Sequence, residues 1–237
     1  MTQHTASDDQ LQGQPDLKLN VAKRVLELVK PGMVVGLGSG PTAALWIRLL
    51  GEQVRGGNLA IQAIASSAES EALGRRCGIP FTTFNECCQV DLTFDDADEI
   101  GPRLALIQGA NGGLLRGKII VSATKKYIVV GDHSKAVSML GSVPLPVEVV
   151  PMAEPLVSEA LREIGFTPKL RRNKRHTPFM TDEGNLVLDC VGLQIGDPHW
   201  IAAEIDAIVG VVEHGLFLDM TDLALIHSGD HIIDRTI

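Results

Sequence analysis

The stretch TFDDADEIGPRLALIQGANGGLLRGKIIVSATKKYIVVGDHSK, residues 93–135, decides how this chain folds and what chemistry it can support. Four acidic residues, Asp95, Asp96, Asp98 and Glu99, fall within five positions; a glycine-rich turn and an apolar run follow. Carboxylates at the end of a strand suit general acid–base work or the binding of sugar hydroxyls. The alternatives are a solvated loop with a helix cap, or a divalent metal site, although the calcium-loop spacing is lacking.

Strands and helices alternate around this stretch. Residues 33–38, 59–66, 90–98, 118–123 and 127–132 are predicted strands, and residues 18–30, 41–54 and 67–78 are predicted helices. This alternation is typical of an α/β fold with a parallel sheet.

The pattern changes after residue 143. A strand and a helix are predicted over 144–165, strands around turns over 169–193, and a helix over 197–210 with Asp197 as its N-cap. Residues 211–228 are expected to return to the first domain as strands. We therefore predict a loose tail over 1–17, a sugar-phosphate domain of 18–142 plus 212–237, and a small α+β domain over 143–211. Trp46 and Trp200 are both expected in the core.

Composition limits the class of protein. The 237 residues are 45% hydrophobic and 21% charged, with a formal net charge of −8, so a general nucleic-acid binder is disfavoured. The four cysteines form no CxxC pair and are expected as reduced thiols in a cytoplasmic protein. No signal region or membrane segment is predicted. The basic run 171–176 is expected to be a solvated hairpin or a subunit contact.

Two turns offer hydroxyl and backbone donors at predicted helix starts. In GLGSGPTAALW, residues 36–46, Ser39 and Thr42 flank Gly40 between a strand and a helix, which fits either an anion site or a tight structural turn. Ser66 and Ser67 precede the next helix, where helix capping is the plainer role. Such strand ends converge on one crevice in open α/β sheets.

Seven segments in order resemble the ribose-5-phosphate isomerases of the A type: GLGSGPTAA, ASSAES, DDADEI, GANGGLLRGKII, GDHSK, LGSVPLPVEVVPMA, and GNLVLDCVG with IDAIVGVVEHGLF. The resemblance runs from about Asn20 to Ile226. It implies a Rossmann-like parallel-sheet domain with an inserted ferredoxin-like α+β domain, and a cytoplasmic homodimer or homotetramer without a cofactor. The implied reaction interconverts ribose 5-phosphate and ribulose 5-phosphate through an enediolate.

The resemblance also implies site residues. Asp95 and Asp98 match aspartates that contact the substrate, and Lys135 matches a sugar-binding lysine. The substrate-binding positions are Ser39, Gly40, Pro41, Thr42, Ser66, Ser67, Gln108, Gly109, Ala110, Asn111 and Lys135.

Four departures from the family pattern bear on the chemistry, beside the mild change at Ser39. Pro41 replaces a serine and has no backbone N–H. Asp96 replaces a glycine, Gln108 a lysine, and Gly117 the glutamate that acts as proton-transfer base. We therefore expect an isomerase that is weak or altered in substrate, with Asp96 or Asp95 as base. The alternatives are a non-catalytic sugar-phosphate binder and a different reaction on the same scaffold.

Overall fold

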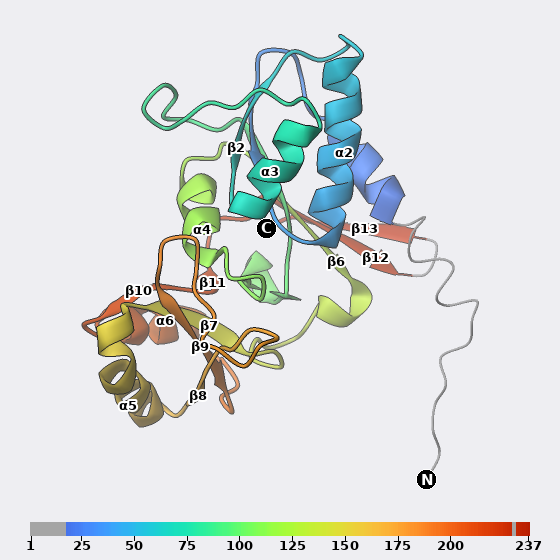
Figure 1. Ribbon diagram of the computed structural model, residues 1–237. Helices are drawn as coiled ribbons and strands as arrows, with labels where there is room; N and C mark the ends of the chain where they lie inside the picture. Colours follow the sequence, from blue (N-terminus) through green and yellow to red (C-terminus); the bar gives the residue numbers. More distant parts are fainter. Residues whose placement is uncertain (1–17, 229–230) are drawn as a thin grey trace.

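The computed structural model describes residues 18–228 and 231–237, so the tail predicted over 1–17 lies outside the described residues. A six-stranded sheet forms one half of the molecule, in the order β13-β12-β6-β3-β1-β2 (Figure 1). Five of its strands are parallel, and β13 runs antiparallel to β12. The strands are β1 (Val34–Leu37), β2 (Gln62–Ala65), β3 (Leu92–Asp96), β6 (Tyr127–Asp132), β12 (Leu223–Ser228) and β13 (His231–Arg235). The predicted parallel α/β sheet is thus confirmed.

Helices cover this sheet. They are residues 18–26, α2 (Pro41–Arg55), α3 (Ala68–Arg76) and α4 (Leu114–Ser122). Trp46 of α2 is fully buried and packs on Phe94 of β3, with ring centroids 5.4 Å apart, so its predicted core position is confirmed. Among the described residues, no helix is long and apolar enough to cross a membrane.

The strand predicted over 118–123 was wrong, because residues 118–122 belong to helix α4 and Ala123 is its C-cap. Leu114, Gly117, Ile120 and Val121 are its buried positions, and this spacing is helical. The β-branched run favoured a strand, but packing on two sides outweighs that local preference. Ile120 packs with Val34 and Val90, while Val121 packs with the core around Tyr127 and Phe217.

The second half is an antiparallel four-stranded sheet in the order β10-β7-β9-β8, with α5 and α6 beside it (Figure 1). Its elements are β7 (Leu145–Val149), α5 (Glu154–Ile164), β8 (Thr167–Leu170), β9 (Leu186–Val191), α6 (Pro198–Asp206) and β10 (Val211–His214). Asp197 caps α6 as predicted, accepting the Trp200 N–H at 3.1 Å. Trp200 itself is 53% exposed, so its predicted core position was wrong: it lies on the solvent side of this first turn.

Short elements connect the two halves. They are β4 (Glu99–Ile100), β5 (Leu106–Ile107) and β11 (Leu216–Phe217), which form a three-stranded sheet, and the 3-10 helices η1 (Pro102–Leu104), η2 (His133–Lys135) and η3 (Pro151–Ala153). The predicted return of residues 211–228 to the large sheet is confirmed for β12, which pairs with β6. It was wrong for residues 211–214, because β10 pairs with β7 of the four-stranded sheet. The predicted domain limits at residues 143 and 211 remain a proposal.

Candidate active site

The carboxyl ends of β1, β2 and β3 bring the predicted polar side chains to one edge of the large sheet. A narrow cavity of about 20 Å³ lies there, which we call the waist. Its lining residues include Asp95, Asp96, Asp98, Gln108 and Gly117. Two larger cavities share lining residues with the waist. One of about 530 Å³ shares Ser39 and Asn111, and one of about 510 Å³ shares Asp98.

Asp95 is a buried carboxyl at the end of β3. Its Oδ1 accepts the backbone N–H groups of Ser39 at 2.8 Å and Asp96 at 2.9 Å. Burial raises the pKa of Asp95 well above its ordinary value, and the charges of Asp96 and Asp98 raise it further. Both hydrogen bonds go to Oδ1, so Oδ2 is the oxygen that can exchange a proton.

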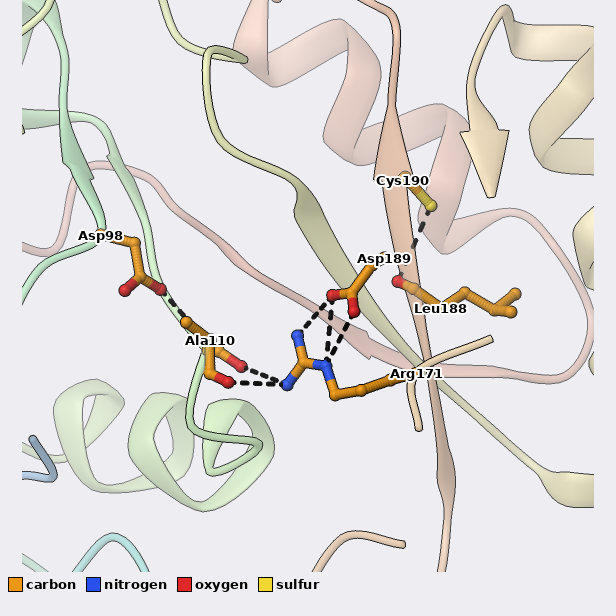
Figure 2. Close-up of polar contacts among 7 residues, drawn as sticks. Asp98, Ala110, Arg171, Leu188, Asp189 and Cys190 are labelled. Atoms are coloured by element: carbon orange, nitrogen blue, oxygen red, sulfur yellow. Dashed lines mark hydrogen bonds and ion pairs between the residues drawn. The ribbon is translucent and has the colours of Figure 1, made fainter. Parts of the chain in front are cut away.

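Asp98 faces the junction between the waist and the 510 Å³ cavity. Its Oδ2 accepts the Ala110 N–H at 2.9 Å, which holds the glycine-rich loop in place (Figure 2). Burial raises the pKa of Asp98, while the nearby cations of Lys135 and Arg171 oppose that rise. Two carboxyls with raised pKa values in one crevice are typical of acid–base chemistry.

Asp96 has a different environment from its two neighbours. Its Oδ2 accepts the N–H groups of Thr42 at 2.9 Å and Ala43 at 3.0 Å, at the start of α2. A carboxylate is favoured at this end of a helix because the first N–H groups lack partners within the helix. The suggested role of Asp96 as base stays a prediction. Its Oδ2 already accepts two hydrogen bonds.

The serines after β2 divide between two environments. Ser67 caps α3, and its Oγ accepts the Ser70 N–H at 3.1 Å, as the capping interpretation predicted. Ser66 is buried, and within the described part of the chain its Oγ has no hydrogen-bond partner. Of the two, Ser67 lines the 530 Å³ cavity, together with Ser39, Gly40 and Pro41.

Gln108 fills the position where the family pattern has a lysine. Its amide nitrogen donates to Asp96 O at 2.9 Å, and its Oε1 accepts the Tyr127 hydroxyl at 2.5 Å. Burial raises the pKa of Tyr127 well above its usual value, so this phenol stays a neutral donor. Gln108 therefore adds no positive charge to the waist.

Two further positions named from the sequence lie next to the waist or in it. Lys135, in η2, lines the 510 Å³ cavity with Asp98, and its Nζ donates to Ala97 O at 2.6 Å. Gly117, in α4, lines the waist itself. A Cβ built at Gly117 would have Phe217 Cζ as its nearest neighbour, at 3.9 Å, which is an ordinary contact distance. A larger side chain therefore has room to start there.

Arg171 was missed as a site residue, because the basic run 171–176 was expected to be solvated. Its side chain is only 13% exposed, and its guanidinium forms an ion pair with Asp189 of β9. Nη1 also donates to Gly109 O at 2.9 Å and Ala110 O at 3.0 Å (Figure 2). Arg171 stands directly after β8 and its backbone pairs with Val187, so its side chain reaches Asp189 two positions further along β9; this pairing gave no signal in the sequence.

Residues that could bind a metal ion lie away from the waist. Within residues 18–228 and 231–237, the one set of three potential ligands is Asp206, Glu213 and His214. Lys118 Nζ lies 2.5 Å from Glu213 Oε1, so a cation already neutralises that carboxylate. This set makes no part of the waist.

Comparison with known proteins gives one consistent result. The sequence model of the family "Ribose 5-phosphate isomerase A (phosphoriboisomerase A)" matches residues 62–231. The ribose-5-phosphate isomerase A of Sphingopyxis alaskensis is 46% identical over 89% of this chain and 92% of its own length. That of Roseiflexus sp. is 44% identical over 90% and 92%.

Solved structures agree in fold. Ribose 5-phosphate isomerase A from Methanocaldococcus jannaschii superposes with a TM-score of 0.89 at 39% identity, covering 94% of this chain and 99% of that one. A D-ribose-5-phosphate isomerase in complex with phospho-erythronic acid superposes with a TM-score of 0.90 at 31% identity, with the same coverage.

Proposed function

The chain belongs to the ribose 5-phosphate isomerase A family, and on that premise we propose that it interconverts ribose 5-phosphate and ribulose 5-phosphate. The observation that carries this proposal is the waist lined by the two carboxyls Asp95 and Asp98, in a chain 46% identical to a named isomerase. No cofactor is required by an aldose–ketose isomerisation, which moves one proton between adjacent carbons and one between adjacent oxygens.

We assign the carbon proton transfer to Asp95. Its carboxylate takes the proton from C2 of the opened aldose, an enediolate forms, and the same proton is returned to C1 while the O2 proton passes to O1. The raised pKa of Asp95 makes its carboxylate a stronger base than an exposed aspartate. Asp98 assists ring opening, and Lys135 and Gln108 bind sugar oxygens. The Ser39–Thr42 loop lies toward the phosphate end of the substrate.

Turnover of ribose 5-phosphate by the full chain tests this function. We expect measurable turnover in the wild type and a loss of about 10²–10⁴-fold in Asp95→Asn, the range typical of a positioned base. Asp234→Asn is the matched control, because Asp234, on β13, is exposed and pairs with Arg24 of the helix over residues 18–26. Binding of ribose 5-phosphate without turnover in the wild type would contradict the proposal and make the chain a sugar-phosphate-binding pseudoenzyme.

We also propose that the protein is cytoplasmic and that copies of this chain assemble into a homodimer or homotetramer. Three apolar side chains are strongly exposed: Met152 at 88%, Leu156 at 75% and Val209 at 93%. Their segments are adjacent, because Val150 N–H donates to Gly210 O at 2.9 Å. Sedimentation analysis of Val209→Asp against the wild type tests this surface. Equal masses of both proteins, as monomers, would contradict assembly.

A further inference from the structure

The N-terminus of α2 already holds an anion, and that anion belongs to the chain itself. Pro41 has no N–H, and the N–H groups of Thr42 and Ala43 both donate to Asp96 Oδ2. The next group, Ala44 N–H, donates to Gly40 O at 2.9 Å within the helix. The first four residues of α2 are thereby accounted for. The two free N–H groups therefore donate to a carboxylate at the end of the helix where a phosphate would otherwise bind.

The backbone around Asp96 holds this carboxylate in position. Asp96 N–H donates to Asp95 Oδ1, and Ser39 N–H donates to the same oxygen, so the end of β3 and the loop before α2 are tied together. Gly40 adopts a φ of 112°, and a Cβ built there would lie 2.6 Å from Asp96 Oδ2. The loop therefore closes directly onto the carboxylate.

A substrate phosphate and the Asp96 carboxylate compete for the same donors. A phosphate that approached Thr42 and Ala43 would have to displace Asp96, and it would also meet a like charge at short range. Gln108 adds no compensating cation, because an amide is neutral, and this one is engaged with Asp96 O and the Tyr127 hydroxyl. A hydroxyl at the same end of the sugar would not be repelled.

We propose that Asp96 is a specificity-determining residue, a built-in competitor that weakens recognition of the substrate phosphate at the start of α2. It lowers the preference of the site for a phosphorylated aldose over the same aldose without phosphate, and its removal restores that preference. This inference rests on the proposed isomerase function for its kinetic consequence. Its binding consequence is independent of turnover.

Calorimetric titration of the full chain with inorganic phosphate tests the binding. We expect Asp96→Gly to bind phosphate at least tenfold more tightly than the wild type, and Asp96→Asn to gain by removal of the charge alone. Asp197→Asn is the matched control, because Asp197 also caps a helix N-terminus, that of α6. We expect this substitution to leave phosphate affinity unchanged. Asp96→Asn keeps an acceptor for α2 and serves as the test where Asp96→Gly fails to fold.

Affinities within twofold of the wild type in the Asp96 variants would overturn the proposal, as would an equal gain in Asp197→Asn. The kinetic arm compares ribose 5-phosphate with D-ribose. We expect KM for ribose 5-phosphate to fall at least tenfold in Asp96→Gly, with kcat retained and KM for D-ribose within twofold. Loss of kcat at unchanged KM would make Asp96 the proton-transfer base and overturn the assignment. If no variant turns over either sugar, the isomerase function fails, while the phosphate titration still decides this inference.

Discussion

At the scale of single residues, Gly117 is the position where a small change can add chemistry. It lies in the first half of α4, lines the waist beside Asp95, and has space for a Cβ. We expect Gly117→Glu to raise kcat for ribose 5-phosphate by on the order of 10²-fold, because a further carboxylate, on the α4 side, reaches the waist. Steady-state kinetics measure this.

Gly117→Gln is the control for that experiment. Both substitutions remove a glycine from a helix interior and so stabilise α4 by about 1 kcal/mol, but glutamine has no ionisable carboxyl. An equal rise in kcat for both variants would show that helix order, and not a new base, is responsible.

His214 gives a residue-scale prediction for pH. It is buried, its Nδ1 accepts the Leu216 N–H at 3.1 Å, and burial together with the positive charge of Lys118 lowers its pKa to about 4. Its folded pKa is therefore below its unfolded value of about 6.5. Above pH 6.5 its contribution to stability is complete, and it is lost progressively as the pH falls toward 4, by up to about 3 kcal/mol.

Urea unfolding of the wild type and His214→Gln between pH 7 and pH 4.5 measures this contribution. The raised pKa values of Asp95, Asp98 and Glu148 act in the opposite direction over the same window, but they are common to both proteins. We expect the stability difference between wild type and variant to shrink as the pH falls. A difference that stays constant with pH would refute the role of His214.

Individual site residues were the hardest part to predict from sequence. The spacing of Asp95 and Asp98 after a strand led directly to their shared cavity. The partner of Asp96 was not predictable, because the first turn of α2 lies 54 positions away along the chain. Arg171 was missed for the same physical reason: its surroundings are set by β9 and by the loop at Gly109, and not by its basic neighbours in sequence.

At the scale of elements, hydrophobic alternation located every strand of the large sheet that it was used to predict, but it failed for α4. The run KIIVS satisfies both a strand and a helix pattern over so short a length. What distinguishes them is the preceding turn, where Gly112 has a φ of 84° and Gly113 stands as N-cap. Tertiary packing on both sides of α4 then fixes the helix.

The end of α5 allows a clean test of one element. Gly165 has a φ of 112°, and Phe166 N–H donates to Leu161 O at 3.0 Å, which is the Schellman arrangement. A Cβ at Gly165 would lie 3.8 Å from Leu193 Cδ1, so space is available and the cost is conformational. We expect Gly165→Ala to lower the free energy of unfolding by about 1 kcal/mol.

Gly196→Ala is the paired substitution. A Cβ there would meet nothing within 4 Å, and its φ is not in the left-handed region. Denaturant unfolding should find this variant unchanged or more stable by up to about 1 kcal/mol. A loss at Gly196 as large as that at Gly165 would mean that the left-handed backbone is not the cause.

At the scale of the whole molecule, the waist depends on a link between the two sheets. Arg171 follows β8 of the four-stranded sheet and pairs with Asp189, while its Nη1 binds the carbonyls of Gly109 and Ala110 (Figure 2). Ala110 N–H in turn donates to Asp98 at the end of the six-stranded sheet. The geometry of an acid–base residue in one half is therefore held by an arginine of the other half.

Removal of the Arg171 side chain should affect catalysis although Arg171 does not line the waist. We expect Arg171→Ala to lower kcat/KM for ribose 5-phosphate by on the order of 10–10²-fold, because the loop that positions Asp98 loses two charge-assisted hydrogen bonds. Arg171→Lys should not restore it, since an ammonium cannot bind the carboxylate and both carbonyls as a planar fork. Arg172→Ala, which removes an exposed arginine bonded to His176 O, should stay near the wild type. Equal losses in the Arg171 and Arg172 variants would show that the basic run acts by charge alone and that the link does not position the site.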